Sequence, residues 1–338
     1  MTGLRNMEIK KIDMPVPKPG EVLIKVEYAG ICGSDIHYYE IGRIANNIVK
    51  GDFILGHECA GEVVEVGSDV KYLKPGDRVA LEPGISCGCC EFCKKGKYNL
   101  CPSMVFLGTP PIHGAFRKYI CFPEKMCFKL PDNVTAMEGA LIEPLAVGMH
   151  AASQGSVKLG SRVAILGAGC IGLVTLLACM ASGATEIFVV DVLEKRLEYA
   201  KKLGATCVIN AKDVDSTEKI REMTQNEGVD VVIETAGTVK TIEQTPYIVK
   251  RGGTIVLLGL ASQDTAQINY MKLIRQEVEL KTVFRYRNIY PSAIQAVANG
   301  KINVKGIVTH EFDFDDTKKA LDFVVENKQE VVKAVIKF

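Results

Sequence analysis

Four cysteines lie close enough in the sequence to bind a metal ion without help from the rest of the chain. They follow the pattern Cys87-x-x-Cys90-x-x-Cys93-x7-Cys101. Four thiolates make a closed tetrahedral set with no position left for a substrate, as in structural zinc sites. Cys89 competes as a ligand, but a two-residue gap lets the backbone turn around the metal and favours Cys87 and Cys90. A cluster of reduced thiols without metal is the alternative.

A second possible metal site combines a thiol, an imidazole and a carboxyl group. Cys32 follows one expected strand, and His57 with Glu58 precedes another. These three ligands would leave a coordination position open for water or substrate, as a catalytic zinc requires. Glu143 is a fourth, acidic candidate, expected at a cleft between two domains. Each residue alone is more often structural, so the combination gains weight only beside a cofactor site.

A glycine-rich segment provides that cofactor site. It follows an apolar strand, opens a helix, and is followed by Asp191 at the end of the next strand. This context predicts a turn that brings a dinucleotide pyrophosphate to a helix N-terminus. Asp191 would accept hydrogen bonds from the ribose hydroxyls and repel a 2′-phosphate, which favours NAD over NADP. Arg196 could weaken that preference, but we expect it to pack near the adenine. The segment contributes Gly167, Gly169, Cys170, Ile171 and Gly172.

The elements that would position these residues are of two kinds. Continuous apolar strands alternate with helices after residue 162, which indicates a parallel sheet covered on both faces. The first 140 residues instead carry short strands separated by Pro-Gly and Gly-Asp turns, which indicates a β-rich, barrel-like domain. The expected parallel strands are 163–166, 187–190, 207–209, 229–233 and 254–258, and the expected short strands are 21–28, 61–66, 78–80 and 115–121.

These patterns predict an α/β chain in which one domain interrupts another. The β-rich domain covers 1–146 and includes the cysteine lobe, 84–102. A doubly wound parallel sheet covers 147–287. The tail, 288–338, returns to the first domain with helices at 291–299 and 317–326 and a strand near 331–336.

Composition narrows the class of protein. The 338 residues include 41 Lys and Arg against 40 Asp and Glu, a balance that argues against a nucleic-acid partner. Residues 163–185 carry no charge and could span a bilayer, but their glycines favour a strand that turns into a helix. The first residues show no signal peptide, and clustered cysteines fit a reducing compartment, so we expect a cytoplasmic protein without membrane contact.

The chain resembles the zinc-dependent medium-chain dehydrogenases, and within them the polyol branch of sorbitol, L-iditol and xylitol dehydrogenases. The general motifs are Gly56-His-Glu58, the cysteine lobe and the glycine segment. The resemblance covers nearly the whole chain and implies a Rossmann domain inserted in a GroES-like catalytic domain. The motifs specific to the branch are His37-Tyr-Tyr-Glu-Ile-Gly-Arg-Ile44, Thr109-Pro-Pro111, Ala140-Leu-Ile-Glu-Pro-Leu145 and Phe284-Arg-Tyr-Arg287.

The resemblance also implies roles for individual residues. Zinc would be held by Cys32, His57 and Glu58, with Glu143 near it or bound through water. Ser34 would lie beside the reacting oxygen, and a proton could leave through it or through water toward Glu143. Phe284 would approach the nicotinamide. The polyol pocket would be lined by Tyr38, Phe106, Thr109, Glu143, Arg285 and Tyr286.

The implied reaction oxidises a secondary alcohol of a sugar alcohol to a ketose, with NAD as hydride acceptor, in a homotetramer. Two departures from the family matter: the N-terminus lacks the usual opening strand, and all four lobe cysteines are present, although animal sorbitol dehydrogenases have lost most of them. The second departure suggests two zinc ions per subunit. The nearest rival is another zinc dehydrogenase, acting on threonine, 2,3-butanediol or simple alcohols. A binding protein on the same scaffold is a further alternative.

Overall fold

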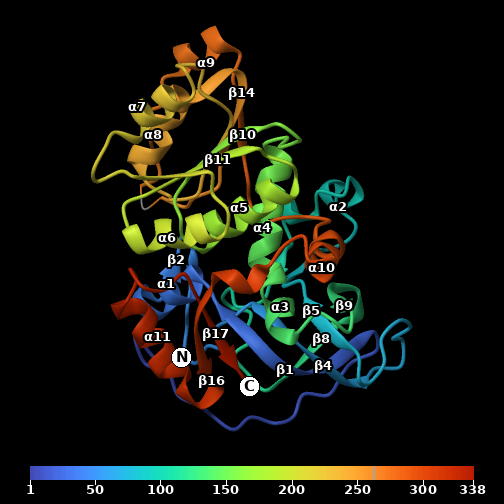
Figure 1. Cartoon of the computed structure of the whole chain (residues 1–338). Helices are drawn as coiled ribbons and strands as arrows, with labels where there is room; N and C mark the ends of the chain where they lie inside the picture. The colour runs from blue at the N-terminus through green and yellow to red at the C-terminus, as the bar shows by residue number, and fades with distance from the viewer. Residues whose placement is uncertain (262) are drawn as a thin grey trace. The chain divides into compact units, whose positions relative to one another are not determined.

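The computed structural model describes residues 1–261 and 263–338, which form two compact units (Figure 1). Unit 1 comprises Met1–Glu143, Tyr290–Gly300 and Val308–Phe338, and unit 2 comprises Pro144–Ile289 and Lys301–Ile307. This division differs from the expected one mainly at 301–307, which leave the returning tail and join unit 2. There, a Cβ atom at Gly306 would lie 2.8 Å from Leu203 Cδ2, so the segment packs directly against unit 2.

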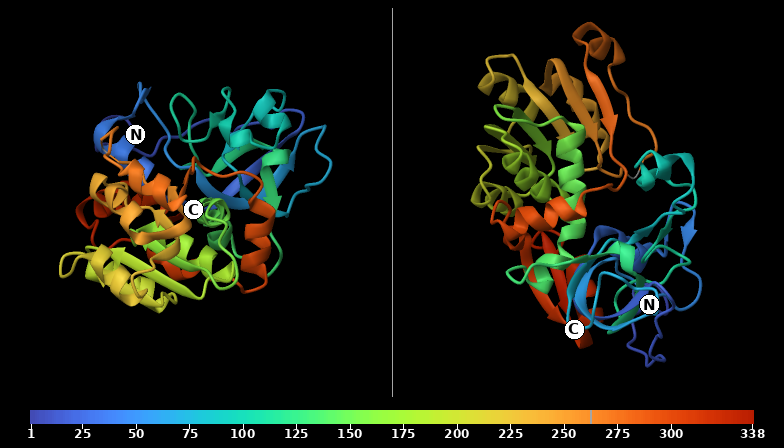
Figure 2. Two further views of the ribbon diagram at one scale, coloured as in Figure 1. Left: turned by 90° about the horizontal axis from the view of Figure 1, so that it is seen from above. Right: turned by 90° about the vertical axis from the view of Figure 1, so that its right-hand side faces the viewer.

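Unit 1 is built around one sheet of seven strands, in the order β16-β17-β1-β4-β5-β9, with β8 also paired to β1. The long central strand β1 is antiparallel to β4, β8 and β17. Figures 1 and 2 show the red C-terminal strands beside the blue β1, so the two ends of the chain complete one sheet. The bounds are β1 (Glu21–Ile31), β4 (Glu58–Val66), β5 (Arg78–Leu81), β8 (Tyr119–Pro123), β9 (Cys127–Lys129), β16 (Val308–Asp313) and β17 (Lys333–Lys337).

Alternating β-branched residues explain the central strand. Val22, Ile24 and Val26 lie on one face of the strand and are buried in the core of unit 1, and Leu23 on the other face is buried as well. The strand expected over 115–121 begins later, at Tyr119. The residues before it pair elsewhere: the Ala115 N–H donates to the Gly56 carbonyl at 2.8 Å and the Phe116 N–H to that of Leu55 at 2.9 Å.

Short elements connect and cover this sheet. The helices of unit 1 are α1 (Gly33–Ile41), α2 (Glu91–Lys94), α3 (Ala136–Ala140), α10 (Tyr290–Ala298) and α11 (Thr317–Glu326), while α4 (Ile142–Gln154) begins in unit 1 and continues into unit 2. Two small hairpins pair β2 (Arg43–Ile44) with β3 (Asn47–Ile48) and β6 (Gly84–Ile85) with β7 (Val105–Phe106). Single 3-10 turns in unit 1 are η1 (Tyr98–Leu100), η2 (Glu124–Met126) and η4 (Phe314–Asp316), whereas η3 (Val304–Ile307) belongs to unit 2.

Unit 2 confirms the predicted doubly wound sheet, because its six strands are parallel in the order β12-β11-β10-β13-β14-β15. The chain winds outward from β10 to β12 and then from β13 to β15, so the order reverses between β10 and β13. Ligands of such sheets bind beyond the carboxyl ends of the strands at this reversal. The strands are β10 (Arg162–Leu166), β11 (Glu186–Asp191), β12 (Cys207–Asn210), β13 (Val229–Glu234), β14 (Val249–Leu257) and β15 (Glu279–Thr282).

Helices cover both faces of this sheet, as right-handed crossovers from the two halves require. The uncharged stretch 163–185 is divided among β10, the glycine turn and the first helix, and no helix among the described residues meets the length and hydropathy needed to cross a bilayer. The helices are α5 (Cys170–Ala181), α6 (Glu194–Lys202), α7 (Ser216–Met223), α8 (Val239–Ile248) and α9 (Tyr270–Gln276).

Candidate metal and cofactor sites

The mixed ligand set predicted from the sequence meets in one place in unit 1. The Cys32 thiol, a His57 ring nitrogen and a Glu58 carboxylate oxygen all lie within 4.8 Å of one another. Cys32 follows the last residue of β1 and is the N-cap of α1. Glu58 is the first residue of the neighbouring strand β4. Because ligands of one tetrahedral zinc lie ~3.5 Å apart, this sulfur, nitrogen and oxygen set fits a zinc ion after small adjustments.

A buried aspartate, which the sequence analysis did not single out, holds the two loops that carry these ligands. Asp35 accepts hydrogen bonds from the Cys32 N–H at 2.9 Å and the Gly56 N–H at 2.9 Å. One of its oxygens lies 3.8 Å from His57 Nδ1. Burial raises the pKa of Asp35 despite these interactions. The only available sequence signal was an acidic residue in the first turn of a helix, which normally indicates capping.

The charges around His57 favour its protonated form when no metal is bound. Burial by itself lowers the pKa of His57, but the nearby Cys32 and Asp35 charges, with a smaller contribution from Glu143, outweigh burial and raise that pKa to about 10. The negative charges around His57 attract a positive charge, and a divalent metal ion would supply it. Zinc would therefore replace a proton here, because an imidazole must be neutral to ligate.

Glu58 is also paired with a buried cation, Lys333. The Lys333 ammonium group contacts Glu58 Oε2, and the two side chains are 2% and 1% exposed. Lys333 also donates to the Ile31 carbonyl at 3.0 Å. It lies on β17 and reaches Glu58 on β4 across the intervening strand β1, at Gly30. A Cβ atom at Gly30 would overlap Glu58 Oε2 and lie 3.0 Å from Lys333 Cε, so only glycine leaves room for this pair.

Several residues expected in the substrate pocket lie near the ligand set within unit 1. The Phe106 ring centroid lies 5.6 Å from that of His57, and the Thr109 N–H donates to the Phe106 carbonyl at 3.1 Å. Tyr38 is buried, with its ring centroid 6.3 Å from that of Phe53. Ser34 is half-buried in α1, two residues beyond Cys32.

The other expected pocket residues are placed differently. Glu143 is buried at the start of α4 and acts on His57 through its charge, but it lies outside the group of three ligand atoms among the described residues. Phe284, Arg285 and Tyr286 belong to unit 2. Tyr286 is buried and Phe284 is exposed. Arg285 adopts a left-handed backbone conformation, φ 56°, and its guanidinium carbon lies 4.8 Å from the Phe284 ring centroid.

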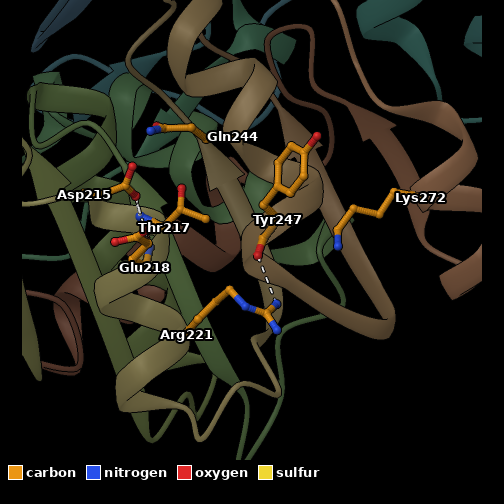
Figure 3. Close-up of a pocket in the computed structure, with 7 residues that line it drawn as sticks. All are labelled: Asp215, Thr217, Glu218, Arg221, Gln244, Tyr247 and Lys272. Atoms are coloured by element: carbon orange, nitrogen blue, oxygen red, sulfur yellow. Dashed lines mark hydrogen bonds between the residues drawn. The ribbon is translucent and has the colours of Figure 1, made fainter.

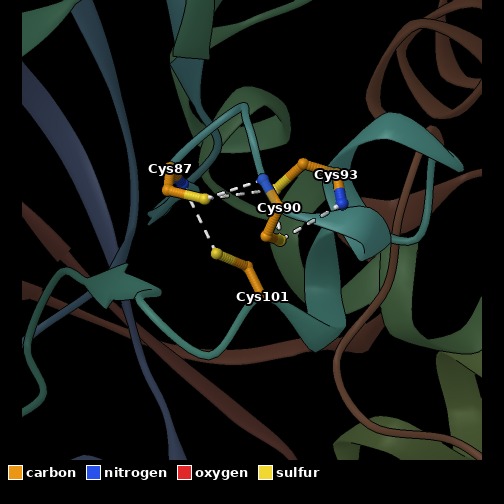
Figure 4. A group of neighbouring side chains, drawn as sticks. All are labelled: Cys87, Cys90, Cys93 and Cys101. Atoms are coloured by element: carbon orange, nitrogen blue, oxygen red, sulfur yellow. Dashed lines mark hydrogen bonds between the residues drawn. The ribbon is translucent and has the colours of Figure 1, made fainter.

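The four-cysteine lobe brings its sulfur atoms together around a common centre (Figure 4). Cys87, Cys90, Cys93 and Cys101 have sulfur atoms within 4.8 Å of one another. Backbone N–H groups donate to these sulfurs: Cys90 to Cys87 at 3.4 Å, Cys93 to Cys90 at 3.5 Å, and Cys87 to Cys101 at 3.4 Å. Donation from the Cys89 and Cys90 N–H groups lowers the pKa of Cys87 to about 6. The arrangement fits a closed tetrathiolate zinc site.

The glycine segment forms the tight turn that it predicts between β10 and α5. Gly169 is the N-cap of α5, and a Cβ atom at Gly172 would overlap the Gly167 carbonyl oxygen. Asp191 accepts a hydrogen bond from the Ala168 N–H of this turn at 2.7 Å, and the Val192 and Leu193 N–H groups that follow it fix its carboxylate at 2.7 Å and 2.9 Å.

Arg196 lies beside the same turn. A Cβ atom at Gly169 would be 3.8 Å from Arg196 Nη1, so the guanidinium group reaches the N-terminus of α5. Cys170 and Ile171 form the first turn of that helix. A negatively charged pyrophosphate would meet both the helix N–H groups and this cation.

A separate pocket of about 320 Å³ on unit 2 contains none of these ligands (Figure 3). Its arginine is engaged by backbone carbonyls: Arg221 donates to Tyr247 O at 3.3 Å and to Asn226 O at 2.8 Å. The Lys272 ammonium lies 5.1 Å from the Tyr247 ring centroid. The lining residues are Asp215, Thr217, Glu218, Arg221, Gln244, Tyr247 and Lys272. Their mixture of charges and contacts gives no indication of catalysis.

Comparison with known proteins agrees with this geometry. Residues 18–132 match the alcohol dehydrogenase GroES-like domain, and residues 170–299 match the zinc-binding dehydrogenase domain. The sorbitol dehydrogenase of Bacillus subtilis is 44% identical over 99% of this chain and 95% of its own length.

Two solved structures are similar along their whole length. One is an Escherichia coli oxidoreductase of unknown specificity, with 51% identity and a TM-score of 0.95 over 99% of this chain and 97% of that one. The other is a Sinorhizobium meliloti zinc-binding dehydrogenase bound to NADP, with 32% identity and a TM-score of 0.91 over 99% and 97%. The predicted resemblance is confirmed: the chain belongs to the zinc-binding alcohol dehydrogenases, within their polyol branch.

Proposed function

We propose that this dehydrogenase oxidises a secondary hydroxyl of a sugar alcohol of the sorbitol or xylitol type to a ketose, reversibly, with NAD as hydride acceptor. The observation that carries the proposal is the buried set of Cys32, His57 and Glu58 in a chain whose second unit has the dinucleotide turn. The similarity to a sorbitol dehydrogenase supports the substrate class. The same active residues would serve threonine, 2,3-butanediol or a simple alcohol, which makes those substrates the competing assignment.

Cys32, His57 and Glu58 would hold the catalytic zinc, which when bound lowers the pKa of a substrate hydroxyl. Asp35, through the Cys32 and Gly56 N–H groups, and Lys333, through the Glu58 carboxylate, hold the segments that carry the ligands in place. The Ser34 hydroxyl, two residues after Cys32, or a water would carry the departing proton toward Glu143. Tyr38, Phe106, Thr109, Arg285 and Tyr286 would line the pocket for the remaining hydroxyls.

The preference for NAD over NADP rests on Asp191. Three backbone N–H groups fix its carboxylate beside the glycine turn, where it would repel a 2′-phosphate. Arg196 lies close to Gly169, so its guanidinium group would pair with the pyrophosphate rather than with the more distant 2′-phosphate of NADP. The expected contacts on the cofactor are Gly167, Gly169, Cys170, Ile171, Gly172, Asp191, Arg196 and Phe284.

The proposal extends to the organisation of the protein. Residues 1–146 with 288–338 would form the GroES-like catalytic domain, with the structural zinc in the lobe 84–102, and residues 147–287 the NAD-binding domain. Twelve free cysteines fit a reducing cytoplasm, and the polyol branch supports a homotetramer.

The decisive experiment measures metal content and then initial rates. We expect two zinc ions per chain and NAD-dependent oxidation of sorbitol, xylitol, galactitol or iditol, with kcat/KM at least ~100-fold lower with NADP. A clear preference for threonine, 2,3-butanediol or a monoalcohol would overturn the polyol assignment. Absence of turnover on every substrate by fully metal-loaded protein would favour a binding protein instead.

A further inference from the structure

A buried glutamate lies beneath two loops of unit 2 where the doubly wound sheet reverses. Glu234 is the last residue of β13, is fully buried, and pairs in register with Leu166 of β10 and Leu257 of β14. The chain leaves these strands through a loop at 235–238 and a loop at 258–261. Both loops lie at the carboxyl edge of the sheet, the edge at which such sheets bind dinucleotides.

Glu234 is bonded to both loops. Its carboxylate Oε1 accepts hydrogen bonds from the Gly237 N–H at 2.9 Å and from the Thr241 hydroxyl at 2.8 Å, just inside α8. Its backbone carbonyl accepts from the Leu258 N–H at 3.1 Å and the Gly259 N–H at 3.0 Å. One residue therefore ties the loop after β13 to the loop after β14.

The two loops are also in direct backbone contact above this carboxylate. A Cβ atom at Gly259 would overlap the Gly237 nitrogen and lie 2.5 Å from Glu234 Oε2. Gly237, with φ 64°, would in turn bring a Cβ atom to 2.5 Å from the Leu260 carbonyl oxygen. Glycine at both positions lets the loops close over Glu234, while Ala236 and Leu260 remain exposed.

The carboxylate is costly to keep in this position. Burial raises the pKa of Glu234 even though Thr241 and nearby N–H groups oppose that effect. Oε2 has no hydrogen-bond donor among the described residues. A buried carboxyl group with a donor to only one of its two oxygens destabilises the fold, so its presence suggests another role. Here the two loops that Glu234 holds lie at the edge of the sheet where ligands bind.

We propose that Glu234 is a positioning residue for the nicotinamide half of the cofactor, because it fixes the 235–238 and 258–261 loops in the conformation that this half meets. The inference rests on the proposed use of a nicotinamide dinucleotide. The two halves of such a sheet bind the two halves of the cofactor: β10 to β12 serve the adenosine side. The β13 and β14 loops then serve the nicotinamide side, and the hydrogen bonds of the Glu234 carboxylate and carbonyl described above go to those loops and to the start of α8.

The test compares two ligands that share the adenosine half. Full-length, zinc-loaded wild type and Glu234→Leu are titrated by calorimetry with NADH and with ADP, which lacks the nicotinamide riboside. We expect Glu234→Leu to raise the Kd of NADH at least tenfold and to change that of ADP less than threefold. Glu234→Gln retains the accepting oxygen and should restore NADH binding to within threefold of wild type.

Two outcomes would overturn the inference: unchanged NADH binding in Glu234→Leu, or equal weakening of NADH and ADP. The wild-type titrations separate this failure from that of the proposed function, since a wild type that binds neither ligand contradicts the function itself.

A milder pair of variants covers the case in which Glu234→Leu does not fold. Thr241→Val removes one donor to Oε1 and should weaken NADH about threefold to fivefold while sparing ADP. The matched control is Thr224→Val at the opposite edge of the sheet, where the Thr224 hydroxyl accepts from the Gly228 N–H at 3.0 Å. The control should leave both Kd values unchanged, and equal effects of the two variants on NADH would contradict the proposal.

Discussion

The two ligand clusters of unit 1 are built in opposite ways. The four cysteines of the lobe come from 15 residues of chain, are mostly solvent-accessible, and are bonded to one another's backbone N–H groups. Cys32 lies between β1 and α1, His57 immediately precedes β4 and Glu58 is its first residue, and the last two are buried. Of their partners, Asp35 lies in the first turn of α1, three residues after Cys32, and Lys333 lies on β17, near the other end of the chain.

The difference separates two kinds of metal site. A set of four thiolates on one loop is complete in itself, so it can stabilise that loop but cannot accept a substrate. A mixed set needs neighbours to hold its ligands and balance their charges, and those neighbours also tune its chemistry. We therefore expect changes in the buried set to affect catalysis, and changes in the lobe to affect stability.

The largest expected effect is on catalysis. His57→Ala removes one of three ligands, and we expect kcat/KM for the polyol to fall by at least ~10³-fold and the metal content to fall to the one ion of the lobe. Rates and elemental analysis measure both. The control is Cys121→Ser, a thiol on β8 outside either cluster. Activity within tenfold of wild type would contradict the role of the buried set.

Lys333→Met tests the charge balance of the buried set. In the metal-free protein it leaves the Glu58 carboxylate buried without a partner, which should cost about 3 kcal/mol of unfolding free energy. Zinc would compensate the same charge, so the loss should be smaller in the loaded protein. Denaturant unfolding with and without zinc measures the difference.

The matched control for that variant is Lys328→Met. Lys328 pairs with Glu40 at 3.0 Å, but its side chain is 58% exposed, so its loss should cost less than about 1 kcal/mol. Equal costs for the two lysines would show that the pair between β17 and β4 has no special importance.

Cys101→Ser tests the independence of the lobe. Serine is a poor zinc ligand, so we expect the lobe ion to be lost and the first thermal transition to fall by roughly 5 °C. In protein that remains folded, kcat/KM should stay within threefold of wild type. Calorimetry and rate measurements check this, with Cys89→Ser as the control in the same lobe. A large loss of kcat/KM in folded Cys101→Ser would show that catalysis depends on the lobe, so the two ligand clusters would not be independent.

The smallest effect concerns Glu82, which accepts a hydrogen bond from Tyr98 of the lobe at 2.8 Å. Burial, with the charge of Glu143, raises the pKa of Glu82 from 4.5 to about 7. Because this carboxyl binds its proton more tightly in the folded chain, it lowers stability progressively as the pH rises from 4.5 to 7. Glu82→Gln should thus be stabilising, and more so at pH 8 than at pH 5 by about 2 kcal/mol.

Denaturant unfolding at the two pH values measures this effect. Glu91→Gln is the control, because Glu91 pairs with Lys95 on the surface with 65% of its side chain exposed. A stabilisation by Glu82→Gln that does not change with pH would mean that Glu82 does not titrate in this range.

The sequence could predict features formed by residues that are close together along the chain, but not those that depend on contacts between distant segments. The lobe spacing, the glycine turn and the alternation of strands and helices are local patterns, and the predicted fold class is confirmed. The ligands Cys32, His57 and Glu58 were identifiable by type, but Lys333 was not, because its role depends on β17 lying next to β1. In the sequence, Glu234 is simply the polar residue at the end of an expected strand. Its role became visible only from its contacts with the 235–238 and 258–261 loops in the structure. Residues 115–118 were expected to open a strand, whereas the Ala115 and Phe116 N–H groups donate to carbonyls of the loop before His57.

The position of β17 also bears on synthesis. The ribosome releases the whole parallel sheet of unit 2 before residue 333 emerges, whereas β1 can pair early with β4 and β8 but waits for its neighbour at residues 28–31 until the last strand arrives. During that interval Glu58 has no lysine beside it. A nascent chain would thus acquire its reactive centre last, so truncated products could fold a nucleotide-binding half without a complete metal pocket.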